Sequence, residues 1–205
     1  MGTLKNVLAF FCLGSVLYIF ISLVSYSSLD PSLSSISSLS GDIQNLGGPF
    51  GAYLSDALFS VIGIGAYLFI AIISFAAVKT LFFYHRTDRL HKAIQIASAI
   101  FLISSFSALC EFYYSGDYFP QSSSGGFIGN LIFFNFSNVF GVVGSLIFIV
   151  IFFLASISLT FSFSWLSVID AIGKGTKYFF QEFSSQFIRL VKFIVNSLRL
   201  IDVSK

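Results

Sequence analysis

Long runs without any charged residue alternate with short polar segments along this chain. A helix crosses the ~30 Å hydrocarbon layer of a bilayer with about 20 apolar residues. Four charge-free runs are long enough, and their apolar parts predict membrane spans at about residues 6–26, 61–78, 93–109 and 139–163. The pattern therefore predicts an all-α integral membrane fold with four transmembrane helices.

The last charge-free run, from Asp117 to Asp170, is the longest and raises the question of whether it crosses the bilayer twice. Two crossings and a turn need roughly 40 apolar and turn residues. The polar residues 135–138 would have to form that turn, and only the short segment 127–134 would precede it. We therefore predict a single crossing in this run.

An amphipathic segment precedes the second predicted span. Its apolar residues recur at spacings of three and four, which is typical of one helix face: Phe50, Tyr53, Leu54, Ala57, Leu58 and Val61. Pro49 suits the first position of such a helix. We expect this helix to lie in the membrane interface, which spares Asp56 the cost of a charge at mid-bilayer, and Gly63 to permit the bend into the second span.

An internal repeat becomes visible when the chain is shifted by 78 residues. Four glycines then coincide: Gly47, Gly48, Gly51 and Gly63 fall on Gly125, Gly126, Gly129 and Gly141. This predicts two repeated hairpins related by an axis along the membrane normal, although a chain rich in glycine can produce such matches by coincidence. The pairs Gly51/Ser55 and Gly141/Ser145 have the small-xxx-small spacing that permits close helix contacts.

Charge is scarce and unevenly distributed. The chain of 205 residues is 56% hydrophobic and 10% charged, whereas a soluble domain carries about 25% charged residues, so lipid must be a partner. All 11 Lys and Arg residues lie before the first span, in the connection 79–92, or after the fourth span. Lys and Arg are retained in the cytoplasm, so both termini are predicted to be cytoplasmic.

The segment after the fourth span is predicted to be a basic amphipathic helix. We divide the chain into a four-helix membrane domain, 1–170, and a cytoplasmic tail, 171–205. Apolar residues of the tail recur at spacings of three and four from Phe180 to Ile201, and basic residues lie largely elsewhere on the helix. Such a helix can lie on the anionic inner leaflet, pack on the membrane helices, or lead to another domain, and the sequence leaves these alternatives open.

No catalytic, cofactor or metal site can be assembled from the sequence. The predicted spans contain no ionisable residue, which disfavours an ion-coupled transporter. Residues 173–176 lack the spacing of a phosphate-binding loop and are interpreted as a helix break after the fourth span. His85 and His91 lack metal-ligand spacing. Cys12 and Cys110 are interpreted as buried thiols near opposite membrane faces.

The polar residues that flank the first two spans resemble a known family. One stretch runs from Tyr26 to Ser32, a second from Asn45 to Asp56, and the matching positions are Tyr26, Ser27, Asp30, Pro31, Asn45, Gly47, Gly48, Pro49, Gly51, Asp56, Gly63 and Trp165. In this order and spacing, over about residues 5–170, the chain resembles the four-helix membrane domain of FtsK/SpoIIIE-type DNA translocases. The resemblance implies a structural role for these residues.

The resemblance also implies a function. In that family the membrane domain anchors a hexameric, ATP-driven DNA pump at the bacterial division septum and takes part in divisome assembly. The pump resides in a C-terminal motor, which is not found up to Lys205, so neither enzymatic activity nor DNA binding is expected of these residues. The expected role is an inner-membrane anchor and scaffold that forms homo-oligomers and contacts divisome membrane proteins. The alternative is an unrelated small polytopic membrane protein, such as a permease subunit.

Overall fold

The computed structural model contains helices and no strands in the residues it describes, which are 2–33, 43–82, 89–114, 123–162 and 164–202. Six helices follow one another: α1 (Gly2–Val24), α2 (Gly48–Ile62), α3 (Gly65–Phe82), α4 (Arg89–Tyr113), α5 (Gly126–Phe161) and α6 (Trp165–Asp202). The chain divides into two compact units, Met1–Ser162 and Phe163–Lys205, which are described separately. The predicted all-α class is confirmed.

Four helices of the first unit are long and apolar enough to cross a bilayer. They are Asn6–Val24 within α1, and α3, α4 and α5 in full. Between 17% and 33% of the residues in their most apolar windows are buried inside the protein, so most residues of each window are at least partly exposed. A water-soluble protein cannot expose that much apolar surface, and a lipid environment accounts for it.

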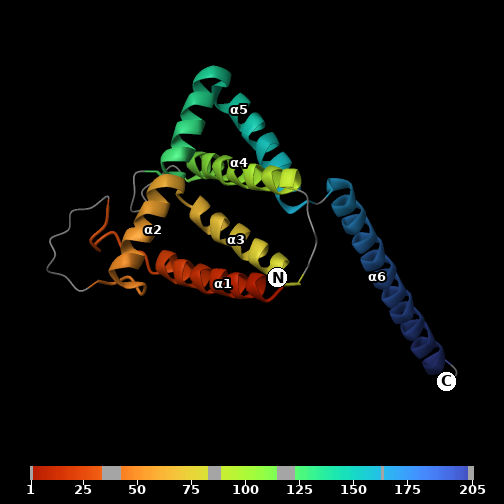
Figure 1. Cartoon of the computed structure of the whole chain (residues 1–205). Coiled ribbons are helices and arrows are strands. Elements are labelled where there is room, and N and C mark those ends of the chain that lie inside the picture. Colours follow the sequence, from red (N-terminus) through yellow and green to blue (C-terminus); the bar gives the residue numbers. More distant parts are fainter. Residues whose placement is uncertain (1, 34–42, 83–88, 115–122, 163, 203–205) are drawn as a thin grey trace. The chain divides into compact units, whose positions relative to one another are not determined.

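The helices of the first unit form two triangular arrangements, shown in Figure 1. In the first, α1 runs along one side, α2 crosses at its end and α3 returns. In the second, α4 takes the place of α1, and α5 supplies both of the other sides because it bends at Gly141, where φ is 69° and ψ is 169°. We call residues 126–140 the first arm of α5 and residues 142–161 its second arm.

The bends correct two of the expected span boundaries. The second span was expected to begin at Val61, but the structure places Val61 in the last turn of α2 and begins α3 at Gly65. The fourth span was expected to begin at Val139, which lies in the first arm of α5, before the bend at Gly141. In both places apolar residues continue past the bend, so hydropathy alone does not mark it.

Positive φ angles mark the repeat in the backbone. Within the described residues, the glycines with positive φ are Gly48, Gly63, Gly126 and Gly141, with φ between 56° and 69°. They form two pairs separated by 78 residues, the shift that superimposes the two halves of the sequence. Residues with a Cβ atom rarely adopt such conformations, so the shared glycines reflect a shared backbone path rather than coincidence.

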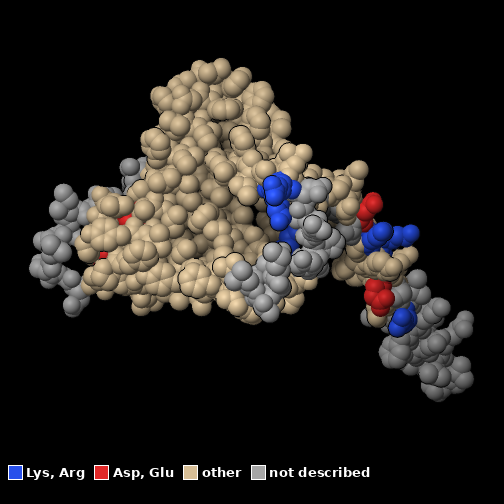
Figure 2. All heavy atoms as spheres, viewed as in Figure 1, with Lys and Arg blue, Asp and Glu red and all other residues tan. Residues whose placement is uncertain are grey.

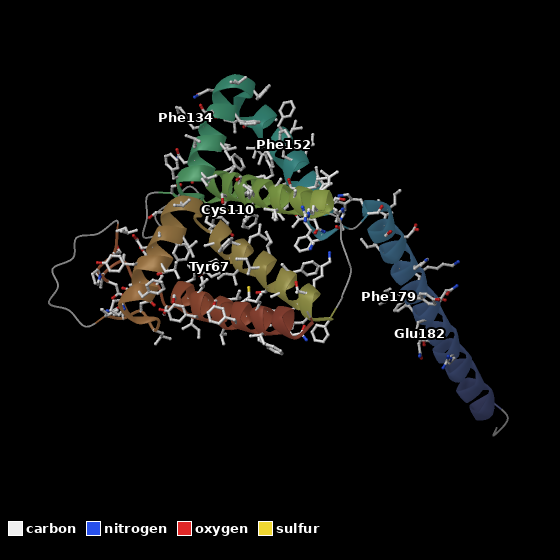
Figure 3. The ribbon with its side chains drawn as sticks, in the orientation of Figure 1. Tyr67, Cys110, Phe134, Phe152, Phe179 and Glu182 are labelled. Atoms are coloured by element: carbon white, nitrogen blue, oxygen red, sulfur yellow. The ribbon has the colours of Figure 1, made fainter. Side chains whose placement is uncertain are left out.

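Aromatic and aliphatic side chains hold each triangle together. The first has a buried cluster contributed by α1, α2 and α3: Val16, Leu23, Phe59, Ile62, Ala66 and Ile70. Tyr67 points toward α1, and its hydroxyl donates to the carbonyl oxygen of Leu23 at 3.4 Å (Figure 3). In the second triangle, α4 packs along α5, where the rings of Phe106 and Phe153 stack with centroids 6.0 Å apart.

Opposite charges lie at opposite ends of the first unit. Among its described side chains, the basic residues Lys79, Arg89 and Lys92 lie at the end of α3 and the start of α4. The acidic residues lie around the ends of α1 and α4 and within α2: Asp30, Asp56 and Glu111. Figure 2 shows this separation across a surface that is otherwise uncharged. We call the two ends the basic end and the acidic end.

The second unit consists of α6, whose course corrects another expectation. A helix break was expected at residues 173–176, but α6 continues through Gly173 and Gly175. A glycine weakens a helix by about 1 kcal/mol without necessarily ending it. The chain breaks earlier, at Ser162, which has the left-handed φ of 56° and ψ of 41°. Trp165 therefore begins α6.

Candidate functional site

A buried carboxylate organises the acidic end of the first triangle. Asp30, which is 2% exposed, follows α1, and its two carboxylate oxygens accept the backbone N–H groups of Gln44 and Asn45, each at 2.8 Å. A charged acceptor forms stronger hydrogen bonds than a neutral one. The carboxylate therefore fixes the backbone that leads into α2 against the segment that follows α1.

Asn45 extends this connection to the helices themselves. Its side-chain amide donates to the carbonyl oxygen of Ser22 at 2.8 Å and to the hydroxyl of Ser55 at 3.3 Å. Its side-chain oxygen accepts the N–H of Gly47 at 2.8 Å. One buried side chain thus joins α1, α2 and the residue that precedes α2. We call Asp30 and Asn45, with these partners, the first clasp.

A tyrosine–aspartate pair closes the same end. The hydroxyl of Tyr26 donates to a carboxylate oxygen of Asp56 at 3.1 Å. Asp56 has no exposed surface, and a buried carboxylate without partners is costly. The ring of Tyr26 also packs edge-on against Phe59, with centroids 5.1 Å apart. Asp56 lies within α2, and its position away from the middle of the bilayer stays a prediction.

Glycines bring α2 close to α1. A Cβ atom added to Gly47 would meet the hydroxyl of Ser22, and one added to Gly51 would lie 2.7 Å from both that hydroxyl and the Asn45 side-chain oxygen. A larger residue at either position would require the Ser22 and Asn45 side chains to move. Within the pair Gly51/Ser55, Gly51 lies against Ser22 of α1, and the Ser55 hydroxyl accepts the Asn45 amide.

The second triangle has a clasp of its own, centred on Glu111. Its carboxylate accepts the Ser123 hydroxyl at 2.6 Å, the Gly125 N–H at 2.9 Å and the Asn130 amide at 3.2 Å. In both triangles an acidic residue near the end of the first helix thus binds the backbone that leads into the second helix. No contact was predicted for Glu111 from the sequence, so this role was missed. The sequence signal is its position after the third span, which parallels that of Asp30 after the first.

The two triangles meet at a junction made mainly of backbone. The N–H of Ile64 donates to the carbonyl oxygen of Ser124 at 2.9 Å, and the hydroxyl of Ser107 donates to the carbonyl oxygen of Ile62 at 2.8 Å. A Cβ atom on Gly63 would lie 2.6 Å from the Gly126 nitrogen. Figure 3 shows Cys110 on α4 in this region, and its carbonyl oxygen accepts the Ser124 hydroxyl at 3.0 Å.

The structure brings most of the motif residues together and separates a few. Tyr26, Asp30, Asn45, Gly47, Gly51 and Asp56 lie at the first clasp, and Ser27 forms the turn before it by accepting the N–H of Leu29 at 3.3 Å. Gly48 and Pro49 begin α2, and Gly63 lies at the junction. Pro31 follows Asp30 outside any helix, and Trp165 lies in the second unit. Sequence reasoning missed Ser22, Ser107 and Ser124, which are inconspicuous among many serines.

The polar contacts of this arrangement bind parts of the chain to one another. The acidic side chains accept hydrogen bonds from other parts of the same chain. No three His, Cys, Asp or Glu side chains come together within the described part of the chain. Cys12 and Cys110 are free thiols, and His85 lies outside the described residues. The clasps and the junction hold helices at fixed positions.

Comparisons with known proteins agree with this picture. The sequence model of the family described as the 4TM region of DNA translocase FtsK/SpoIIIE matches residues 2–173. DNA translocase FtsK 1 of Neisseria meningitidis is 31% identical over 171 residues, which are 80% of this chain and 21% of the relative. DNA translocase FtsK of Pseudomonas aeruginosa is 31% identical over 200 residues, which are 91% of this chain and 24% of the relative. No solved structure matches.

The extent of the match decides what can be assigned. The chain spans about a fifth of the length of the curated relatives it matches. The matched part is the four-helix membrane region, so the similarity assigns no catalytic activity to these residues. The match does not support the alternative of an unrelated permease subunit. The chain is a multi-pass inner-membrane protein that belongs to the family of FtsK/SpoIIIE four-transmembrane regions.

Proposed function

We propose that this chain anchors an FtsK-type DNA translocase in the membrane at the division septum, as a homo-oligomer that contacts other membrane proteins of cell division. The observation that carries the proposal is the match over residues 2–173, in which the family's characteristic polar residues form clasps between helices. Residues used in this way stabilise a scaffold. The role in cell division and chromosome segregation is therefore tethering.

The basic end faces the cytoplasm in this proposal, and both termini are cytoplasmic. Lys79, Arg89 and Lys92 at one end, with Asp30, Asp56 and Glu111 at the other, support this orientation through the retention of Lys and Arg inside the cell. Alkaline phosphatase fused after Ser40 or Gln121 is expected to be active, and phosphatase fused after Arg89 inactive. The reverse pattern would refute the orientation.

The motif residues are proposed to act by positioning α1, α2 and α3 rather than by binding a ligand. Asp30 and Asn45 support this view because their polar atoms bind the backbone of neighbouring segments. Variants of these residues are then expected to lower the stability and the amount of protein in the membrane together. A variant that keeps wild-type stability but loses septal recruitment would instead indicate a contact with a partner.

Recruitment to the septum is the direct test of the anchor. A fluorescent protein fused to the chain is expected to form a band at midcell in dividing cells of a bacterium that carries the relatives' division machinery. The control is Gly14→Ala, in which an added Cβ atom has nothing within 4 Å. Uniform fluorescence around the cell rim, with no midcell band for either chain, would refute the septal role.

A further inference from the structure

The glycine bends of the first unit differ in what contacts them. At Gly63 and Gly126 an added Cβ atom would collide with the backbone of the other bend. At Gly141 and Gly48 an added Cβ atom would have nothing within 4 Å. Gly141 is the counterpart of Gly63 in the repeat, and Gly48 is the counterpart of Gly126. One pair is therefore closed within the chain, and the equivalent pair is open.

The closed pair shows how the two halves of such an interface fit. The end of α2 and Gly63 lie against Ser124 and the first turn of α5, so closely that a Cβ atom on Gly126 would be 2.8 Å from the Ile62 nitrogen. Residues beside the contact are covered: Ile62 is 8% exposed and Ser124 is 4% exposed. The contact therefore joins the bend of one repeat to the N-terminal turn of the next.

The open surfaces are apolar and exposed at the equivalent positions. Phe140, the counterpart of Ile62, is 49% exposed, and Val142, the counterpart of Ile64, is 50% exposed. Leu46, the counterpart of Ser124, is 79% exposed. Figure 1 shows that the bend of α5 and the start of α2 are at separate places on the first unit, so one chain does not close this pair itself.

We propose that a second copy of this chain closes the open pair, with the N-terminal turn of its α2 seated on the bend of α5 in the first copy. The occupant is inferred from continuity, because the same fold already makes this contact once between its own repeats. The proposal deepens the homo-oligomer of the proposed function and rests on it. Each copy presents the bend of α5 to one neighbour and the N-terminal turn of α2 to another, which is a heterologous contact that yields a ring or a chain of copies.

The interface between copies differs from the internal one in its side chains. Gly65 contacts Ser107 so closely that an added Cβ atom would collide with the serine hydroxyl, whereas its counterpart is Val143, which is 72% exposed. Leu46 likewise replaces Ser124. The contact between copies is therefore apolar where the internal contact has serine residues. Its backbones must be farther apart, and a cross-linker has to allow for that extra distance.

Disulfide cross-linking in native membranes tests the proposal. In a chain with Cys12→Ser and Cys110→Ala, the pair Leu46→Cys and Val142→Cys corresponds to the internal neighbours Ser124 and Ile64. Oxidation, or a bis-maleimide of about 10 Å, is expected to give a ladder of dimers, trimers and larger species. Chains that carry only one of the two cysteines, when mixed, are expected to stop at dimers of one chain of each kind.

A matched control uses the bend that is already closed. Val61 lies beside Gly63 and is 47% exposed, against 50% for Val142, so the pair Leu46→Cys and Val61→Cys presents the same residue types with similar access. This control is expected to give at least about tenfold less cross-linked product. Equal ladders from both pairs would show random collision and would overturn the proposal.

Three further outcomes would also overturn it. They are the absence of adducts from the Leu46/Val142 pair, efficient homodimers of the Val142→Cys chain alone, which indicate a symmetric contact, and adducts of Val142→Cys with a different protein. Each of these outcomes is compatible with the proposed anchor if the chain that carries the introduced cysteines still forms a midcell band. The absence of a midcell band from the wild-type chain would instead refute the anchor, so the two failures can be distinguished.

A bulky substitution gives an independent measurement. Val142→Trp adds volume at the open bend, and the control Ile96→Trp adds it on α4 at a site that is 64% exposed. We expect Val142→Trp to weaken self-association about tenfold, measured by single-molecule photobleaching in nanodiscs over a range of protein-to-lipid ratios, and Ile96→Trp to leave it unchanged. Unchanged self-association of Val142→Trp would overturn the proposal.

Discussion

Single polar side chains fix the position of whole helices at the acidic end of this protein. Asn45 contacts the backbone of α1, the side chain of Ser55 on α2 and the N–H of Gly47 with one amide group. Asp30 in the first triangle and Glu111 in the second each accept hydrogen bonds from backbone N–H groups. Polar groups that water cannot reach must find partners within the protein, so each of these contacts is costly to remove.

Removal of the Asn45 side chain is the first prediction at this scale. Asn45→Ala leaves the N–H of Gly47 and the carbonyl oxygen of Ser22 without this partner, and we expect a loss of about 1–3 kcal/mol in the free energy of unfolding. The measurement is a denaturant titration in mild detergent. The control is Gln44→Ala, because Gln44 joins the first clasp through its backbone N–H. Equal stability of Asn45→Ala and wild type would contradict the role of the first clasp.

The close approach at Gly51 gives a second prediction. Gly51→Ala places a Cβ atom 2.7 Å from the Ser22 hydroxyl, so the buried Ser22 side chain or α1 itself must shift, and we expect a loss of about 1–3 kcal/mol. Adding Ser22→Gly is expected to restore part of it, which a double-mutant cycle in the same titration measures. Gly14→Ala is the control and is expected to raise helix stability slightly. A purely additive cycle would show that this contact is not the cause.

At the scale of elements, glycines with positive φ mark the positions where one helical segment ends and the next begins. Gly63 separates α2 from α3, and Gly141 divides α5 into two arms. The φ of 69° and ψ of 169° at Gly141 belong to a region that is open almost only to glycine. A helix that crosses the membrane is thereby joined to one that runs in another direction, without a loop.

The bend in α5 is therefore expected to depend on its glycine. Gly141→Ala should favour a straighter α5, since the bent conformation becomes costly by about 1–3 kcal/mol. Spin labels at Phe134 and Phe152, which lie on the two arms in Figure 3, report the change by electron–electron distance measurement. A continuous helix would place their backbones about 27 Å apart, from 1.5 Å per residue. We expect the distance distribution to shift toward that value.

Gly144→Ala provides the matched control for the bend, because Gly144 lies in the same helix, in the second arm, without a positive φ. Its added Cβ atom has one neighbour, the Phe140 Cβ atom at 3.1 Å. The distance between the labels is expected to stay at the wild-type value in this variant. An unchanged distance in Gly141→Ala would show that packing against α4, rather than glycine geometry, holds the bend.

At the scale of the whole first unit, two similar triangles are joined at a junction where backbone meets backbone. Each triangle has its own clasp, and the junction adds the hydrogen bonds of Ile64 and Ser107. Because the triangles are separate in sequence, residues 2–82 and 89–162, each half contains the residues of its own clasp. The architecture is therefore one of two modules that recognise each other.

This modularity predicts that the protein can be divided. Two fragments, one that ends at Phe82 and one that begins at Arg89, are expected to assemble when they are expressed together, and to copurify from membranes. Gly63→Ala in the first fragment should reduce copurification about tenfold, because its Cβ atom would collide with the backbone at Ser124. Gly14→Ala is again the control. Copurification unaffected by Gly63→Ala would place the recognition elsewhere than at the junction.

The sequence by itself determined the lipid environment, the all-α fold class and the number of membrane-spanning helices. Scarce charge and long apolar runs predicted four membrane helices, and the periodic apolar positions before the second span predicted α2. Glycine identities predicted the repeat. These features are local, since hydropathy and backbone freedom are properties of a few neighbouring residues. The resemblance carried by Asp30, Asn45 and Gly47 predicted the family but not what those residues contact.

Tertiary structure decided the partners of the polar residues and the places where the chain turns. The many serines cannot be told apart by sequence, yet Ser22 lies against the glycines of α2 and Ser107 donates a hydrogen bond at the junction. Glu111 is the counterpart of Asp30 because its carboxylate binds the backbone that leads into α5. The helix break that was expected at Gly173 and Gly175 occurs instead at Ser162. A glycine permits a bend, but only the packing of other segments around it determines whether a bend forms and whether its surface is covered or open.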